Sequence, residues 1–121
     1  MLMERLNLDP VVWGNSIQFD AAVKNGDGSA VDGSTIAEAW FTGKKAVSDA
    51  DGSAVFQVKL STGGITKAGN VLTVKVADVA SAHANKAMPL ICDLKVKFTD
   101  GFEVVVARGG LQVLEAVTQS G

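Results

Sequence analysis

The sequence predicts an all-β fold, an antiparallel β-sandwich of about seven to eight strands with one short helical crossover. Two observations predict this fold. Apolar and polar residues alternate in four separate segments, the pattern of strands with one buried and one solvated face. Turn-forming residues recur between these segments at a spacing typical of β-sandwiches. A chain of 121 residues is expected to form one domain.

The alternating segments are predicted as strands at residues 16–23, 53–60, 71–76 and 90–98. Each places apolar side chains on one face and polar side chains on the other. In LICDLKVKF, for example, Leu90, Cys92 and Leu94 share a face, and Asp93 and Lys95 lie opposite. We therefore expect the first face to form the core.

Turns are predicted where Gly, Asp, Asn and Ser cluster, because these residues tolerate or stabilise turn conformations. Asp100 and Gly101 separate two strand-like runs and predict a two-residue hairpin turn of type I′. The pair Gly109-Gly110 is expected to form a bulge or a bend in the following strand.

The segment FEVVVA, residues 102–107, is also predicted to be a strand, but it does not alternate cleanly. Val104, Val105 and Val106 place apolar side chains on both faces. Two explanations are open, namely burial of both faces within the sandwich and a contact with a neighbouring subunit. Val105 is therefore a candidate interface residue.

The first 13 residues are more apolar than a solvated terminus needs to be, and we separate them from the sandwich domain of residues 14–121. They form either an edge strand of this domain or an arm that docks on a neighbouring subunit. The candidate interface residues in this segment are Leu2, Leu6, Leu8, Val11, Val12 and Trp13.

One Ala-rich segment, residues 77–87, lacks alternation and predicts the helical crossover. Asp78 is a suitable N-cap for one or two helical turns. Met88-Pro89 would end the helix, because the residue before proline disfavours helical geometry.

Charge and hydropathy argue against several partners. The net charge is −2, with no clustered basic surface of the kind that binds nucleic acid or anionic membranes. No apolar run reaches the length of a membrane span, and the N-terminal residues do not form a signal peptide, because Glu4 and Arg5 interrupt them. We expect the chain to stay in the compartment where it is made.

The sequence offers little catalytic chemistry, so we expect no enzyme activity, cofactor, metal or catalytic residue. His83 has no second histidine or cysteine near it, and Cys92, the only cysteine, lies on an apolar strand face. The acidic turns in the windows beginning at Asn25 and Asp49 lack the glycine and glutamate that an EF-hand loop requires at its sixth and twelfth positions. We therefore interpret them as ordinary turns.

Several short motifs resemble those of small immunoglobulin-like β-sandwich domains of tailed bacteriophages and prophages. They are GGI at residues 63–65, ADVA at 77–80, DLKV at 93–96, DG at 100–101, GLQV at 110–113 and VT at 117–118. The named relative is the N-terminal domain of phage baseplate upper proteins. Family members often carry tyrosine before the Asp-Leu pair, whereas this chain has Cys92 there and no tyrosine at all. The relatives continue into a long C-terminal region, so this chain is expected to act as a free-standing domain.

The resemblance implies an immunoglobulin-like fold and a non-catalytic structural role in a virion assembled in the cytoplasm of a host bacterium. The expected role is an adaptor in the tail, baseplate or neck, in several copies and in contact with other virion proteins. The alternatives are a capsid decoration protein and a receptor- or carbohydrate-binding module. The last would need an exposed aromatic residue. Trp13 and Trp40 are the candidates, although we predict Trp40 in the core.

Overall fold

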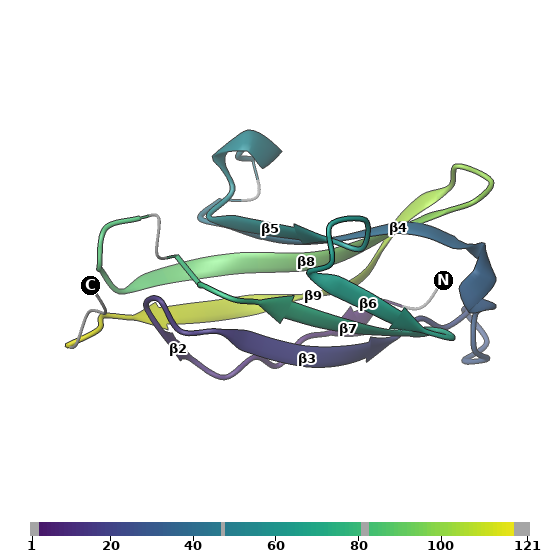
Figure 1. Ribbon diagram of the computed structural model, residues 1–121, viewed down its shortest axis with the longest axis horizontal. Coiled ribbons are helices and arrows are strands. Elements are labelled where there is room, and N and C mark those ends of the chain that lie inside the picture. Colours follow the sequence, from purple (N-terminus) through teal and green to yellow (C-terminus); the bar gives the residue numbers. More distant parts are fainter. Residues whose placement is uncertain (1–2, 47, 81–82, 118–121) are drawn as a thin grey trace.

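The computed structural model describes residues 3–46, 48–80 and 83–117, which form two β-sheets lying one over the other (Figure 1). The strands are β1 (Glu4–Arg5), β2 (Val11–Val12), β3 (Ile17–Ala22), β4 (Ile36–Lys44), β5 (Phe56–Lys59), β6 (Ile65–Ala68), β7 (Val71–Val76), β8 (Met88–Phe98) and β9 (Glu103–Leu114). Two single-turn 3-10 helices, η1 (Gly33–Thr35) and η2 (Asp51–Ser53), precede β4 and β5. No helix in the described ranges is long and apolar enough to cross a membrane.

The larger sheet has the order β1-β9-β8-β4-β5, and β2 also pairs with β9. The smaller sheet has the order β3-β7-β6. All pairs are antiparallel except those of β1 and β2 with β9, which are parallel. The predicted all-β sandwich is therefore confirmed. The strand number was underestimated, because the N-terminal edge consists of two separate two-residue strands.

The core lies between the sheets and contains the apolar faces that the alternation predicted. Leu72 and Val74 of β7 and Leu94 and Val96 of β8 have no exposed surface. Phe41 of β4 is also fully buried. Because side chains on a strand point alternately to opposite faces, the polar residues between these positions lie on the outer faces of the sandwich.

The predicted helix at residues 77–87 is wrong for the residues that the structure describes there, all but 81 and 82. The backbone of Val79 forms hydrogen bonds with residues 14 and 15 and not within a helix. Val79 N–H donates to Asn15 O at 2.9 Å, and Val79 O accepts from Gly14 N–H at 2.9 Å. The Val79 side chain is fully buried, and Ala80 has a left-handed φ of 63°. These contacts are incompatible with a run of right-handed helical residues.

The β8–β9 hairpin lies where it was predicted, but its turn has a different geometry. Phe98 N–H donates to Phe102 O at 2.8 Å and closes a loop of three residues, 99–101. Gly101 N–H donates to Phe98 O at 2.9 Å, and only Gly101 of these three residues has a positive φ, of 90°. A type I′ turn requires two successive positive φ angles. The loop is therefore a three-residue connection in which Gly101 takes the left-handed position.

The irregular apolar run of β9 is explained by a β-bulge. Ala107 pairs with Leu94 and Val105 pairs with Lys95, so Val106 is the extra residue. The bulge shifts the alternation by one residue. Val106 is buried at 4% exposure, while Val105 lies on the outer face beside Lys95. The bulge lies at Val106 and not at Gly109-Gly110, whose pairing with β8 is regular.

Candidate binding surfaces

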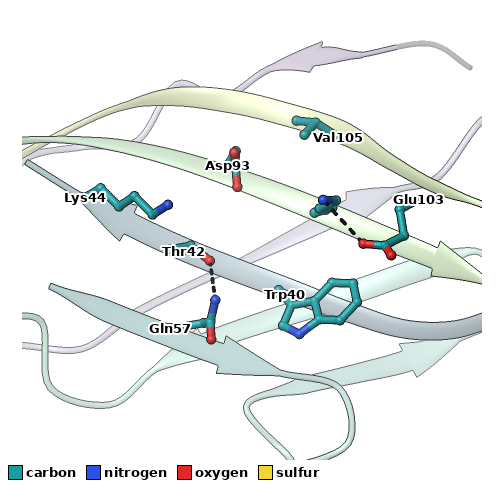
Figure 2. Close-up of a pocket in the computed structure, with 8 residues that line it drawn as sticks. Trp40, Thr42, Lys44, Gln57, Asp93, Glu103 and Val105 are labelled. Atoms are coloured by element: carbon teal, nitrogen blue, oxygen red, sulfur yellow. Dashed lines mark hydrogen bonds and ion pairs between the residues drawn. The ribbon is translucent and has the colours of Figure 1, made fainter. Parts of the chain in front are cut away.

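The outer face of the larger sheet contains a hollow that we call the Trp40 groove. Its volume is about 340 Å³, within the range of small-ligand pockets. It is lined by Trp40, Thr42 and Lys44 from β4, Gln57 from β5, Asp93 and Lys95 from β8, and Glu103 and Val105 from β9. Figure 2 shows Trp40 and Val105 on opposite sides of the hollow, with polar side chains between them. The groove therefore combines apolar and hydrogen-bonding surface.

The position of Trp40 corrects the prediction that this residue belongs to the core. Its neighbours Ala39 and Phe41 are fully buried, so the pleat of β4 turns Trp40 to the outer face. It pairs there with Lys59 of β5 and Lys95 of β8. A sequence signal for this arrangement exists but did not enter the prediction. It is the alternation of inward-facing Ala39, Phe41 and Gly43 with outward-facing Trp40, Thr42 and Lys44.

Polar contacts hold the side chains of the groove in place. Gln57 Nε2 donates to Thr42 Oγ1 at 3.0 Å, and Lys95 Nζ lies 3.3 Å from Glu103 Oε1 (Figure 2). At one end of the groove, Arg108 Nη2 lies 3.9 Å from Asp93 Oδ2. The two ion pairs are partly exposed, so they orient the side chains more than they stabilise the fold.

A second surface lies at the open edge of the smaller sheet, and we call it the β3 edge. β3 pairs with β7 on one side and with no other strand in the described part of the chain. A hollow of about 450 Å³ lies beside it, lined by residues 7–12 and 15–19. Ile17 and Phe19 contribute half-buried apolar side chains to this hollow.

Within the described ranges, the backbone groups of β3 along this edge have no partner strand. Val23 N–H donates to Asn70 O at 2.8 Å, which shows that the odd-numbered residues of this segment face β7. The N–H groups of the even-numbered residues, beginning with Gln18, consequently point away from the sheet. An edge of this kind can accept a further strand.

The structure divides the candidate interface residues among different environments. Leu2 lies outside the described residues. The N-terminal segment pairs with β9 of the same chain as an edge strand, with Leu6, Leu8 and Trp13 packed partly against the core. Val11 is buried at 6% exposure, and Val12 is half-buried. Leu8, Val11 and Val12 meet at the hollow beside β3, whereas Val105 lies in the Trp40 groove.

Cys92 and His83, the residues considered for catalysis, both contribute to the packing or hydrogen bonding of the fold. Cys92 is fully buried, as predicted, and burial, followed by the nearby Asp93 carboxylate, raises the pKa of its thiol to about 12. The backbone oxygen of His83 accepts a hydrogen bond from Trp13 Nε1 at 3.0 Å. No group of three or more acidic, cysteine or histidine residues within the described ranges could hold a metal ion.

The acidic turns are closed by their own side chains. Asp27 Oδ1 accepts hydrogen bonds from the hydroxyl and backbone N–H of Ser29, and Asp32 Oδ1 does the same with Ser34. The serine hydroxyls, and then the backbone N–H groups, lower the pKa of both carboxyl groups. This geometry is ordinary turn chemistry.

Comparison of the sequence with models of known protein families gives no match, and comparison with curated proteins gives none either.

Proposed function

We propose that the chain is a non-catalytic structural protein of a tailed-bacteriophage virion, an adaptor of the tail, baseplate or neck that packs against other virion proteins. The β3 edge is the observation that carries this proposal. It offers unused backbone hydrogen bonds and a neighbouring apolar hollow. The proposed partner is an extended segment of a neighbouring virion subunit.

The strand order supports an immunoglobulin-like identity for the sandwich. In that fold, one sheet contains strands B, E and D in neighbouring positions, and the other contains G, F and C, extended by C′ in variable-type domains. The orders β3-β7-β6 and β9-β8-β4-β5 correspond to these arrangements. The disulfide of antibody domains is replaced by packing, with Cys92 as a lone buried thiol.

An immunoglobulin-like sheet of the B-E-D type normally has a further strand, A, beside B. Here β3 takes the place of B, and the N-terminal segment pairs with β9 of the other sheet instead. The position beside β3 is therefore free of a strand in the described part of the chain. A strand from a neighbouring subunit would complete the smaller sheet at this position and cover Ile17 and Phe19.

This form of assembly requires no catalytic group and gives a defined geometry. Main-chain hydrogen bonds would provide affinity, and alternate side chains of the added strand would enter the hollow between β3 and the N-terminal segment. Leu8 and Pro10 of the N-terminal segment also line that hollow. The apolar residues of the N-terminal segment would then contribute to the interface without leaving their own domain.

The test is a proline scan of the β3 edge. Gln18→Pro removes an N–H that points away from β7, and proline is tolerated at such positions. Gln18→Ala is the matched control, because it changes the side chain and keeps the N–H. Both variants are expected to keep the unfolding temperature within a few degrees of the parent, with Gln18→Pro alone failing to enter virions.

The measurement is quantitative mass spectrometry of gradient-purified particles from cells that produce the phage and express each tagged variant. The parent chain and Gln18→Ala are expected at a fixed stoichiometry, and Gln18→Pro at background. Absence of the parent chain from particles would disprove the virion role. Equal incorporation of the two variants would exclude the β3 edge as the contact.

A further inference from the structure

The Trp40 groove has a chemistry that the proposed strand addition at β3 does not use. We propose that this groove is a binding site for an anionic saccharide, with Trp40 as the stacking platform. The proposal is independent of the virion role, because it concerns the outer face of the other sheet.

The environment of Trp40 suits a ligand that stacks on its ring. The ring is half-buried between Lys59 and Lys95 on the neighbouring strands, so the sheet fixes its orientation and leaves part of its surface exposed. No group in the described ranges accepts a hydrogen bond from its indole N–H. A sugar ring has an apolar C–H face and peripheral hydroxyl groups. It can pack on such an indole while accepting a hydrogen bond at the ring edge.

Several hydrogen-bonding groups lie between Trp40 and Val105. The Gln57 amide donates one N–H to Thr42 and keeps its second N–H and its oxygen for a ligand. The carboxylates of Asp93 and Glu103 accept hydrogen bonds only, which suits the hydroxyl groups of a saccharide. A polyhydroxylated ring can use an aromatic surface, an amide and carboxylates together.

Charge on this face also favours an anionic ligand. Apart from Lys44, whose Nζ donates to Asp49 O, the outward-facing positions of β4, β5, β8 and β9 carry four cations and three carboxylates, although the whole chain has a net charge of −2. The four cations are Lys59, Lys95, Lys97 and Arg108, and the carboxylates are Glu38, Asp93 and Glu103. A ligand with carboxylate or phosphate groups complements this excess of positive charge.

The groove continues past Thr42 and Asp93 into a smaller hollow of about 40 Å³ that includes Ile91 and Arg108. From Trp40 to Lys44 the surface extends roughly 13 Å along β4. This length suits a short oligosaccharide. The planar guanidinium of Arg108 can bind a carboxylate or phosphate through two parallel hydrogen bonds at the far end.

Other acidic partners fit less well. Single-stranded nucleic acid needs successive aromatic residues for successive bases, and the groove has one. An acidic peptide would satisfy the cations but would have less use for a flat aromatic surface.

The test uses the whole chain labelled with nitrogen-15 and two probes, tetragalacturonic acid and mannose 6-phosphate, with neutral cellotetraose as the control sugar. The two tryptophans provide an internal comparison, because Trp13 donates its indole N–H to His83 O and lies outside the groove. Either anionic probe is expected to shift the Trp40 indole signal and leave the Trp13 signal in place. The probe that binds identifies the acidic group.

Two variants in the groove and one control variant outside it test which side chains contribute to binding. Trp40→Ala is expected to weaken binding at least about tenfold, the effect of losing one aromatic stacking contact. Lys95→Gln is expected to weaken binding of the anionic probe and reduce its dependence on salt. Thr66→Ala, at an exposed position of β6 in the smaller sheet, is expected to bind as the parent does.

Three outcomes would overturn the proposal. The first is no shift with either probe at millimolar concentration. The second is poly-glutamate binding as tightly as the sugars, which would assign the groove to an acidic protein. The third is a concentration-dependent dimer, detected by sedimentation, that Trp40→Ala dissociates, because the groove would then be an interface between copies.

Discussion

Phe19 of β3 and Phe41 of β4 meet edge to face, with ring centroids 5.0 Å apart and an interplanar angle of 71°. The contact joins the two sheets, because the two strands belong to different sheets. Phe41 also lies 5.5 Å from Phe56 of β5, measured between ring centroids. Three aromatic rings thus link the β3 edge to strands whose outer faces form the Trp40 groove.

We expect Phe41→Ala to destabilise the fold by about 3–5 kcal/mol, since it removes a fully buried ring from the centre of this cluster. Chemical denaturation of the variant and the parent would measure the loss. Phe102→Ala is the control, because Phe102 is 61% exposed, and a change of at most about 0.5 kcal/mol is expected there. Similar losses in the two variants would contradict the described core.

Two adjacent glycines of β9 provide a matched test of the N-terminal segment. A Cβ at Gly109 would meet the backbone carbonyl of Leu6, whereas a Cβ at Gly110 would have only ordinary contact with Leu90 O, at 3.7 Å. We expect Gly109→Ala to displace the segment around β1 and to speed hydrogen exchange at the Leu6 N–H, which donates to Arg108 O.

Gly110→Ala should leave that exchange rate near the parent value. Hydrogen exchange followed by mass spectrometry of N-terminal peptides would compare the two variants. Unchanged protection in Gly109→Ala would mean that the N-terminal segment does not lie against β9 in solution.

The stability of the protein is expected to fall as the pH rises above about 9, the ordinary pKa of a cysteine thiol. The unfolded chain then releases the Cys92 proton, whereas the folded chain keeps it until the pH approaches 12. The folded state binds more protons in this interval, so alkaline conditions favour unfolding. Denaturation curves between pH 8 and pH 11 would show a steeper decline for the parent than for Cys92→Ala.

The same burial predicts that Cys92 is unreactive in the native protein. A thiol-specific reagent at pH 8 is expected to label it only at the rate of unfolding. Labelling should become rapid in denaturant. Fast modification under native conditions would show that the β8 thiol is accessible, contrary to its full burial.

The sequence predicted those parts of the fold in which local pattern and tertiary packing agree. The strands β3, β5, β7 and β8 alternate because one face is buried and the other is solvated, so their core residues were identified directly. The strand β4 was harder to recognise, since Ala39 and Gly43 are small and a register shift after Ile36 interrupts the alternation before Phe41.

Other features depend on contacts that no local pattern contains. The bulge at Val106 is defined by the register of β9 against β8, and the helix expected at residues 77–87 is prevented by the backbone of Gly14 and Asn15. The Trp40 groove was missed for a similar reason. Its side chains come from four strands, and only the strand order brings them together.

The parallel pairing of β2 with β9 has a consequence for how the domain is made. Val11 lies opposite Val113, about a hundred residues later in the chain. Contacts of such long sequence separation form slowly, because a large loop must close first. During synthesis the N-terminal segment has to wait until β9 has left the ribosome before it can find its partner. Its apolar side chains are exposed to chaperones and neighbouring chains for most of translation.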